Sequence, residues 1–259
     1  MPDSFISEIW RSRSLMVLFA LNEIKLRYRN SVLGFLWAFL EPLLMLSVLY
    51  FVFTNIFKNS IQDYPLYLLF GLIIWYMFSR STLGGLSSLL DKASIIQKIY
   101  FRREIAVISS CLSAFIMMCF ELVAFSVFLI AFKFIPPMTI VFLPLILTDL
   151  FVLSLGISLL LSVLNVYFRD IKFVWQVMLQ AGFFLSPVFY KIELFPENIR
   201  WILNLNPMAS ILDMSRDLVL YDSLPNETSA LYLIVITCII FLMGWSIFRS
   251  RQRTIVEEI

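Results

Sequence analysis

Long apolar runs with few charges constrain this sequence more than any other feature. They recur along the whole chain, and several exceed the roughly 18–20 residues that a helix needs to cross about 30 Å of hydrocarbon. The composition agrees, because 61% of the 259 residues are hydrophobic and only 15% are charged, against roughly 45–50% and 25% in soluble domains. We therefore expect an all-α integral membrane protein.

The apolar runs predict about six transmembrane helices. Their hydrophobicity is continuous rather than alternating, which favours helices over a membrane β-barrel, and a helix satisfies its own backbone polar groups in lipid. The expected spans are residues 31–57, 64–90, 105–132, 139–166, 173–190 and 231–248.

The positive charges between these spans are strongly asymmetric. One side carries Arg11, Arg13, Lys25, Arg27, Arg29, Lys92, Lys98, Arg102, Arg103, Arg169, Lys172, Arg249, Arg251 and Arg253. The other side carries Lys58, Lys133, Lys191, Arg200 and Arg216. By the positive-inside rule both termini are expected in the cytoplasm. A single transmembrane domain then covers 1–259, with a cytoplasmic N-terminal segment and interface helix at 1–30, the bundle at 31–248 and a cytoplasmic tail at 249–259.

Several absences narrow the function. The chain has no histidine, so His-ligated metals and imidazole catalysis are excluded. None of the seven glycines precedes a lysine, as a phosphate-binding P-loop requires. We therefore expect no catalytic residue, metal site or cofactor in this chain, and any energy from ATP and Mg²⁺ must come through a partner. The net charge of +2 does not indicate nucleic-acid binding.

Residues 17–30 have a helical pattern but are too charged to span a membrane. Val17, Leu21, Ile24 and Tyr28 share one face of the predicted helix. Such a helix is expected to lie flat in the cytoplasmic interface. It is either a topological anchor or a lever between a cytoplasmic motor and the first span.

The cytoplasmic loop 91–104 combines apolar and polar side chains in a short predicted helix. Its apolar face holds Ile95, Ile96 and Ile99. This surface suits docking into a groove on another protein, or packing against the bundle or the membrane.

On the outer side, residues 191–229 are richer in apolar and aromatic residues than an ordinary loop. Pro187 is expected to break the fifth span. Asn206 and Pro207 predict a helix start, with an N-cap followed by a first-turn proline. We expect short helices there that form a lid over an exit or an interfacial belt.

Four charged residues fall within or near the expected spans. They are Glu41, Arg80, Glu121 and Asp149. Because charge in hydrocarbon is costly, each is expected to face a partner, water or the membrane boundary.

Six stretches, in this order, resemble the permease subunits of polysaccharide-exporting ABC transporters, within the ABC-2 membrane family. The stretches are LRYRNSVLGFLWAFLEPLLML at 26–46, YPLYLLFGLIIWYMF at 64–78, IIQKIYFRREI at 95–105, LNVYFRDIKFVWQ at 164–176, FFLSPVFY at 183–190 and LNPMASILDMSRDLVL at 205–220. Together they cover nearly the whole chain.

The resemblance implies a complex of two copies of this chain and two ATP-binding subunits in the bacterial inner membrane. It would export a lipid-linked polysaccharide, most simply an O antigen, or else a capsule or teichoic acid. In the resemblance, 91–104 corresponds to the helix that contacts the ATPase, 17–30 to the interfacial helix, 164–170 to the cytoplasmic turn after the fourth span and 196–219 to external gate helices. The residues expected to contact the ATPase are Ile95, Gln97, Lys98, Tyr100, Phe101 and Arg102.

A sliding glycan needs many weak contacts rather than one tight site, and aromatic rings suit this because apolar sugar faces stack on them. The expected channel-lining residues are Tyr50, Phe51, Trp75, Tyr76, Phe183 and Phe184. Aromatic residues also fill bundle cores and interfacial belts, so that alternative stays open.

The residues expected at a headgroup entrance are Tyr28, Arg29, Glu41 and Arg169. Arginines can hold a phosphate or pyrophosphate, but they can also merely follow the positive-inside rule.

Two other classes remain open at this stage. An ion-coupled secondary transporter would use Glu121 or Asp149 as its proton-linked carboxylate, and would show internal repeats that the sequence lacks. A passive membrane scaffold would bind partners without substrate-dependent ATP turnover.

Overall fold

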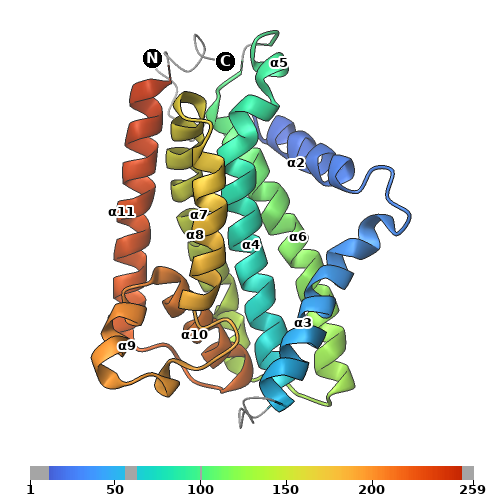
Figure 1. The fold of residues 1–259 in the computed structure, drawn as a ribbon, viewed down its shortest axis with the longest axis vertical. Coiled ribbons are helices and arrows are strands. Elements are labelled where there is room, and N and C mark those ends of the chain that lie inside the picture. Colours follow the sequence, from blue (N-terminus) through green and yellow to red (C-terminus); the bar gives the residue numbers. More distant parts are fainter. Residues whose placement is uncertain (1–11, 56–62, 100, 253–259) are drawn as a thin grey trace.

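The computed structural model describes residues 12–55, 63–99 and 101–252. Over these residues the chain is a bundle of helices without β-strands (Figure 1). Five of the described helices are long and apolar enough to cross a membrane. The expected all-α membrane fold is therefore confirmed, and it follows from the need to satisfy every backbone polar group inside lipid.

The elements follow one another without long irregular segments in the described chain. In order they are α2 (Arg13–Arg27), η1 (Gly34–Leu36), α3 (Trp37–Asn55), α4 (Tyr64–Asp91), α5 (Ala93–Ile96), α6 (Glu104–Ala131), η2 (Met138–Phe142), α7 (Leu143–Tyr167), α8 (Ile171–Leu185), η3 (Ile192–Leu194), α9 (Glu197–Asn204), α10 (Pro207–Leu220) and α11 (Glu227–Arg251).

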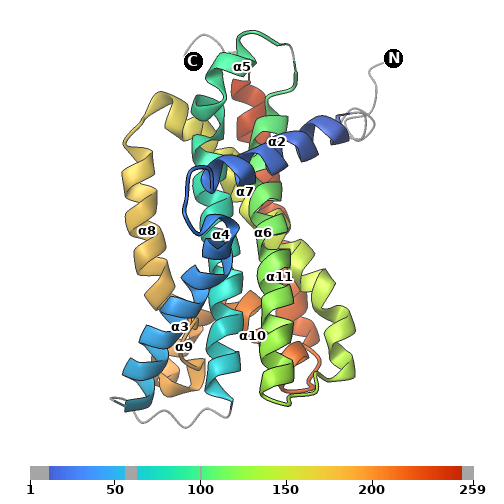
Figure 2. The ribbon, with the colours of Figure 1, turned by 90° about the vertical axis from the view of Figure 1, so that its right-hand side faces the viewer.

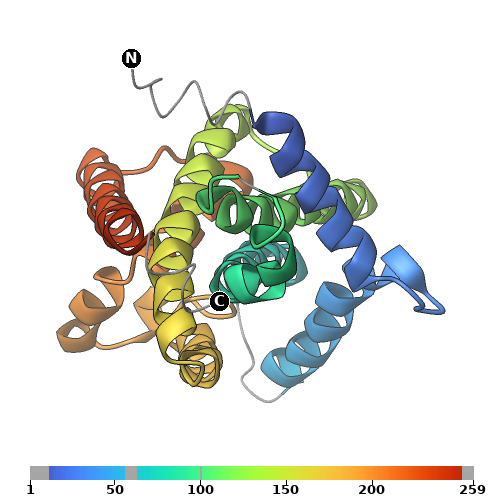
Figure 3. The same cartoon turned by 90° about the horizontal axis from the view of Figure 1, so that it is seen from above.

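Helix α4 is the centre of the bundle. It packs against α3, α6, α7, α8 and α10, and the view from above places it among the other helices (Figure 3). In its most apolar stretch 78% of the residues are buried, against 17% in the stretch that contains α3. Residues on α4 are therefore in position to connect most other parts of the molecule.

The two ends of the bundle differ. Helix α5 lies at one end, which we call the α5 end, and α9 and α10 lie at the other, the α9 end (Figure 1). Helix α2 crosses α6 near the α5 end instead of running parallel to it (Figure 2). A helix is present where the interfacial helix was predicted, although it begins at Arg13 and ends at Arg27, and its position in the membrane interface stays a prediction. Its exposed side chains Val17, Leu18 and Leu21 form an apolar face.

The expected fifth span, 173–190, is shorter than a full crossing. Helix α8 has 15 residues and ends at Leu185, so it is about 22 Å long at 1.5 Å per residue, less than the ~30 Å hydrocarbon layer. The residue before a proline disfavours helical backbone, and Ser186, which precedes Pro187, is extended. The chain turns back there, as the proline predicted.

The expected helix within 91–104 is also much shorter than its segment. Helix α5 is a single turn from Ala93 to Ile96, and residues 97–99 form turns. A helix of this length has too few i→i−4 hydrogen bonds to be stable alone, so its position depends on the residues that flank it.

Two glycines allow α7 and α11 to pack closely. A Cβ atom placed on Gly244 would collide with the backbone carbonyl of Gly156, and one on Gly156 would lie 2.7 Å from the Cα of Phe241. Such small-residue contacts are a main source of helix association in membranes, where apolar burial supplies no driving force.

Gly244→Ala should therefore separate α7 from α11 and lower the thermal stability of the purified protein by about 1–3 kcal/mol, the usual cost of overpacking. Gly84→Ala is the matched control, because its new Cβ would lie at an ordinary 3.4 Å from Glu23 Oε1. Thermal unfolding in detergent measures both. Equal melting temperatures for the two variants would contradict this account of the α7–α11 contact.

Candidate functional site

A groove of about 540 Å³ lies between α3, α4 and α8. Its lining residues are Met45, Trp75, Tyr76, Ser79, Leu83, Gln176, Leu179, Gln180, Phe183 and Phe184. The groove thus combines aromatic rings with two amides and a hydroxyl, which suits a ligand with both apolar faces and hydrogen-bonding groups.

Several contacts join α4 and α8, which form two walls of the groove. The rings of Trp75 and Phe183 meet edge to face with centroids 5.8 Å apart. Trp175 Nε1 donates a hydrogen bond to Thr82 Oγ1 over 3.0 Å. Gly182 leaves room for the indole, because an added Cβ would lie 3.1 Å from Trp75 Cη2.

The structure brings together four of the six aromatic residues expected to line a channel. Trp75, Tyr76, Phe183 and Phe184 all line the groove. The other two lie further along α3: Tyr50 stacks on Tyr64 with centroids 6.2 Å apart, and Phe51 is exposed.

Sequence reasoning missed the polar members of the groove. They are Ser79, Gln176 and Gln180. Helical spacing is the signal that would have found them, since Ser79 lies four residues after Trp75 and Gln180 lies four residues after Gln176, on one face of each helix.

Arg80 connects three helices through two carboxylates. Its Nη2 lies 2.9 Å from Glu41 Oε2 on α3, and its Nη1 contacts Glu121 Oε1 on α6. The guanidinium also lies over the ring of Tyr76, 5.1 Å from its centroid. The expectation that charges in the spans have partners is confirmed for these three residues, and also for Asp149, whose Oδ2 accepts a hydrogen bond from Thr237 over 2.9 Å.

The residues expected at a headgroup entrance fall into separate places. Tyr28 lies near Arg80: burial raises the pKa of Tyr28, and the positive charge of Arg80 lowers it in part. Glu41 belongs to the Arg80 cluster. Arg29 is exposed just after α2, and Arg169 is exposed in the turn between α7 and α8.

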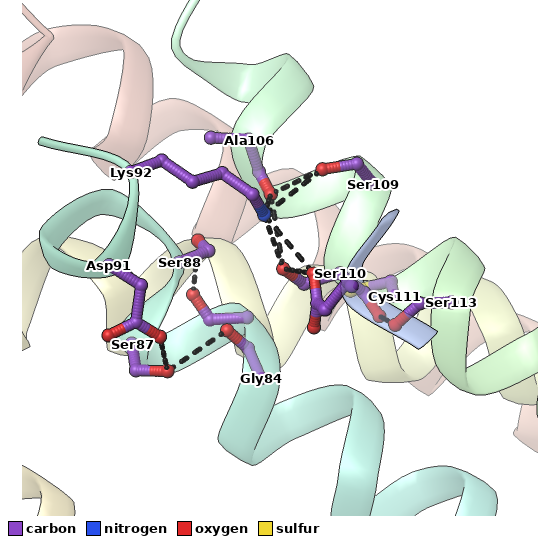
Figure 4. Close-up of polar contacts among 12 residues, drawn as sticks. Gly84, Ser87, Ser88, Asp91, Lys92, Ala106, Ser109, Ser110, Cys111 and Ser113 are labelled. Carbon is purple, nitrogen blue, oxygen red and sulfur yellow. Dashed lines mark hydrogen bonds and ion pairs between the residues drawn. The ribbon is translucent and has the colours of Figure 1, made fainter. Parts of the chain in front are cut away.

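At the α5 end, Lys92 joins α4, α2 and α6 (Figure 4). Its Nζ donates to Glu23 Oε2 at 3.2 Å, Ala106 O at 3.1 Å, Ser109 Oγ at 3.2 Å and Ser110 Oγ at 2.9 Å. Glu23 Oε2 also accepts from Ser110 Oγ at 2.9 Å. Lys92 directly precedes α5, so this network fixes where that one-turn helix sits.

The residues expected to contact an ATPase are oriented in different ways. Gln97 and Lys98 are exposed, and Ile95 is half-buried. Phe101 turns inward, with its ring 5.6 Å from that of Phe19 on α2. Arg102 is half-buried, and Tyr100 lies outside the described residues.

At the α9 end, Arg216 is almost fully buried, with 1% of its surface exposed. It lies 3.6 Å from the centroid of the Tyr67 ring and donates to the carbonyls of Pro187 and Val188 over 2.5 and 2.6 Å. These contacts of Arg216 fasten the chain that follows α8 to the centre of the bundle.

Asp213 lies one turn before Arg216 on α10. Burial raises the pKa of Asp213 to about 7.

The N-cap expected at the start of α10 is confirmed. Asn206 Oδ1 accepts a hydrogen bond from the backbone N–H of Met208 over 3.0 Å, and Pro207 is the first residue of the helix.

The fold of the described residues defines a multi-pass α-helical membrane protein. Residues 15–220 match the family described as ABC-2 type transporter. This chain belongs to the ABC-2 type transporter family.

Three curated relatives are similar over nearly their whole length. The chain is 31% identical over 245 residues, 94% of both chains, to the O-antigen export system permease protein RfbA of Klebsiella pneumoniae. It is 28% identical over 256 residues, 98% of both chains, to the protein of the same name from Myxococcus xanthus. It is 26% identical to the polysialic acid transport protein KpsM of Escherichia coli, over 92% of this chain and 93% of the relative.

Lys92→Met should loosen α2 from the bundle, because it leaves Glu23 without its ion pair, and a lost charged hydrogen bond costs about 1.5–3 kcal/mol. Limited proteolysis of the purified protein between α2 and α3, together with thermal unfolding, measures this. Lys98→Met, which removes an exposed lysine from the same segment, is the control. Unchanged cleavage in Lys92→Met would contradict the role given to the network.

Proposed function

We propose that this chain is the permease subunit of an ABC transporter that exports a lipid-linked polysaccharide, an O antigen or a capsule, across the bacterial inner membrane. The observation that carries the proposal is the match over 94% of both chains with a relative named as an O-antigen export permease. The groove of aromatic rings and amides supports it, because such a surface fits a glycan. The same match favours the exporter over an ion-coupled transporter.

The groove supplies weak, repeated contacts for a long chain. The rings of Tyr76 and Phe184 would stack on apolar sugar faces, while Gln176 and Gln180 would exchange hydrogen bonds with hydroxyl groups, and the buried ring of Trp75 supports the wall of the groove. A chain held this way slides, since no single contact is strong enough to stop it.

A second copy of the chain is the proposed partner on the open side of the groove. Helix α8 is too short to cross the membrane alone, and it exposes large apolar side chains. These are Phe173, Val174, Val177, Met178, Phe184 and Leu185. A facing copy would cover this surface and close the groove into a channel.

The α5 end is the proposed contact with the ATP-binding subunits, of which the proposed complex has two. Gln97, Lys98 and Ile99 are exposed there and suit a small docking surface. Lys92 would pass a displacement of α5 to α2 through its hydrogen bond with Glu23 and to α6 through its hydrogen bond with Ser110. In this proposal the α5 end and both termini lie in the cytoplasm, which the lysines and arginines near the α5 end support.

The test is complementation in cells that lack the chain, with surface glycan as the readout. Phe184→Ala removes one ring from the groove, and a ring contact contributes about 0.5–1.5 kcal/mol, so export of long glycans should slow about two- to tenfold. Phe132→Ala removes an exposed ring at the end of α6, which belongs neither to the groove nor to the α8 surface, and should export at the wild-type rate.

Membrane levels of both variants, measured by blotting, exclude a loss of protein. Wild-type export in Phe184→Ala would contradict the assignment of the groove, and a wild-type chain that restores no surface glycan would contradict the proposed function.

A further inference from the structure

A second groove, apolar and about 380 Å³ in volume, lies between α7, α10 and α11. It shares no lining residue with the groove between α3, α4 and α8. Leu145 and Ile234 are exposed along it, and Leu233, which also lines it, is buried. Helices α7 and α11 are both long and apolar enough to cross a membrane. This α7–α11 groove therefore opens toward hydrocarbon.

The α7–α11 groove extends from the α9 end of the bundle about halfway across a membrane. Glu227, the first residue of α11, lines it at the α9 end. Asp149 lines it on α7 and accepts a hydrogen bond from Thr237 over 2.9 Å. At 1.5 Å per residue, Thr237 lies about 15 Å further along α11 than Glu227, which is half of the ~30 Å hydrocarbon layer. The acyl chains of one leaflet occupy that depth.

The mouth of the α7–α11 groove is acidic. Glu227 is exposed there, and a neighbouring polar cavity of about 360 Å³, which shares Met214 and Pro225 with the groove, is lined by Asp213 and Asp217. In the described part of the chain, neither cavity is lined by a lysine or an arginine. An ammonium group would be attracted to this rim, whereas a headgroup with only negative charge would be repelled.

The α7–α11 groove is not on the surface that the proposed second copy would cover. Helix α11 packs against α7 and α10, and it lies on the opposite side of the bundle from α3 (Figure 3). Lipid tails are as apolar as leucine side chains. Lipid is therefore the simplest occupant of an apolar groove on this side.

We propose that the α7–α11 groove binds an acyl chain of a membrane phospholipid whose headgroup carries an ammonium group, as ethanolamine does. The acyl chain lies on Leu145, Leu233 and Ile234, and the ammonium group pairs with Glu227. Asp149 marks the depth at which the chain ends, because a carboxylate is disfavoured against methylene groups. Such a lipid site is independent of the exported substrate and of the side that the α9 end faces.

The test is native mass spectrometry of the full-length chain, purified with the partners it retains and given equal amounts of phosphatidylethanolamine and phosphatidylglycerol. The wild-type chain should retain phosphatidylethanolamine about two- to fivefold better, which is the ratio that one exposed ion pair provides. Glu227→Gln should lose this preference. Glu197→Gln, which neutralises an exposed carboxylate in the first turn of α9, should keep it.

A second variant tests the position of the acyl chain. Ala230 lines the α7–α11 groove, so Ala230→Phe should fill it and abolish the preferential retention of phosphatidylethanolamine. Ala131→Phe makes the same change at the exposed end of α6, and should retain lipid as the wild-type chain does.

Equal retention of the two phospholipids by the wild-type chain overturns the proposal, and so does a preference that survives Glu227→Gln. Should Ala230→Phe fail to fold, Glu227→Gln still decides whether Glu227 holds the headgroup. A photoreactive amino acid in place of Leu145 identifies the occupant in the native membrane. Cross-links to phospholipid support the site, whereas cross-links to a protein chain overturn it.

Discussion

Charge inside the membrane is the constraint on which this structure depends. Arg80 is stable near hydrocarbon because Glu121 and Glu41 flank it, and removal of the buried partner, Glu121, would cost about 3–5 kcal/mol. The same contacts connect α3 and α6 to the central helix. A requirement of electrostatics thus also determines how α3, the least buried of the long helices, is attached to the bundle.

Helix α4 links the features that carry function. It bears the groove residues Trp75 and Tyr76, then Arg80 one turn later, and it ends beside Lys92. At the α9 end, Tyr64 and Tyr67 donate to the carbonyls of Phe189 and Tyr190 over 2.9 and 2.7 Å. A continuous helix of 28 residues therefore joins the proposed ATPase contact, the ion pairs of Arg80 and the segment that follows α8.

Much of the fold was predictable from local sequence. Spans follow from apolar length, the start of α10 from Asn206 and Pro207, and the end of α8 from Pro187. The requirement for partners was predictable at Arg80, but their identities were not, because Glu41 and Glu121 lie 39 and 41 residues away in the chain. Periodicity determines which face of a helix is apolar and says nothing about which helix will lie against it.

The burial of Arg216 shows the same limit at the other end. Sequence reasoning counted this arginine among the charges outside the spans. It does lie outside the candidate spans, on α10, but the structure buries it against Tyr67, where backbone carbonyls freed by the break after α8 accept its hydrogen bonds. The contact between a buried cation and these carbonyls depends on the tertiary structure, so neither the residue type nor its spacing in the sequence predicts it.

Co-purification of the tagged chain from its native membrane tests the central claim most directly. The account predicts that an ABC-type ATP-binding subunit is recovered with the chain in equal amount. Reproducible recovery of intact chain without any such subunit would contradict it.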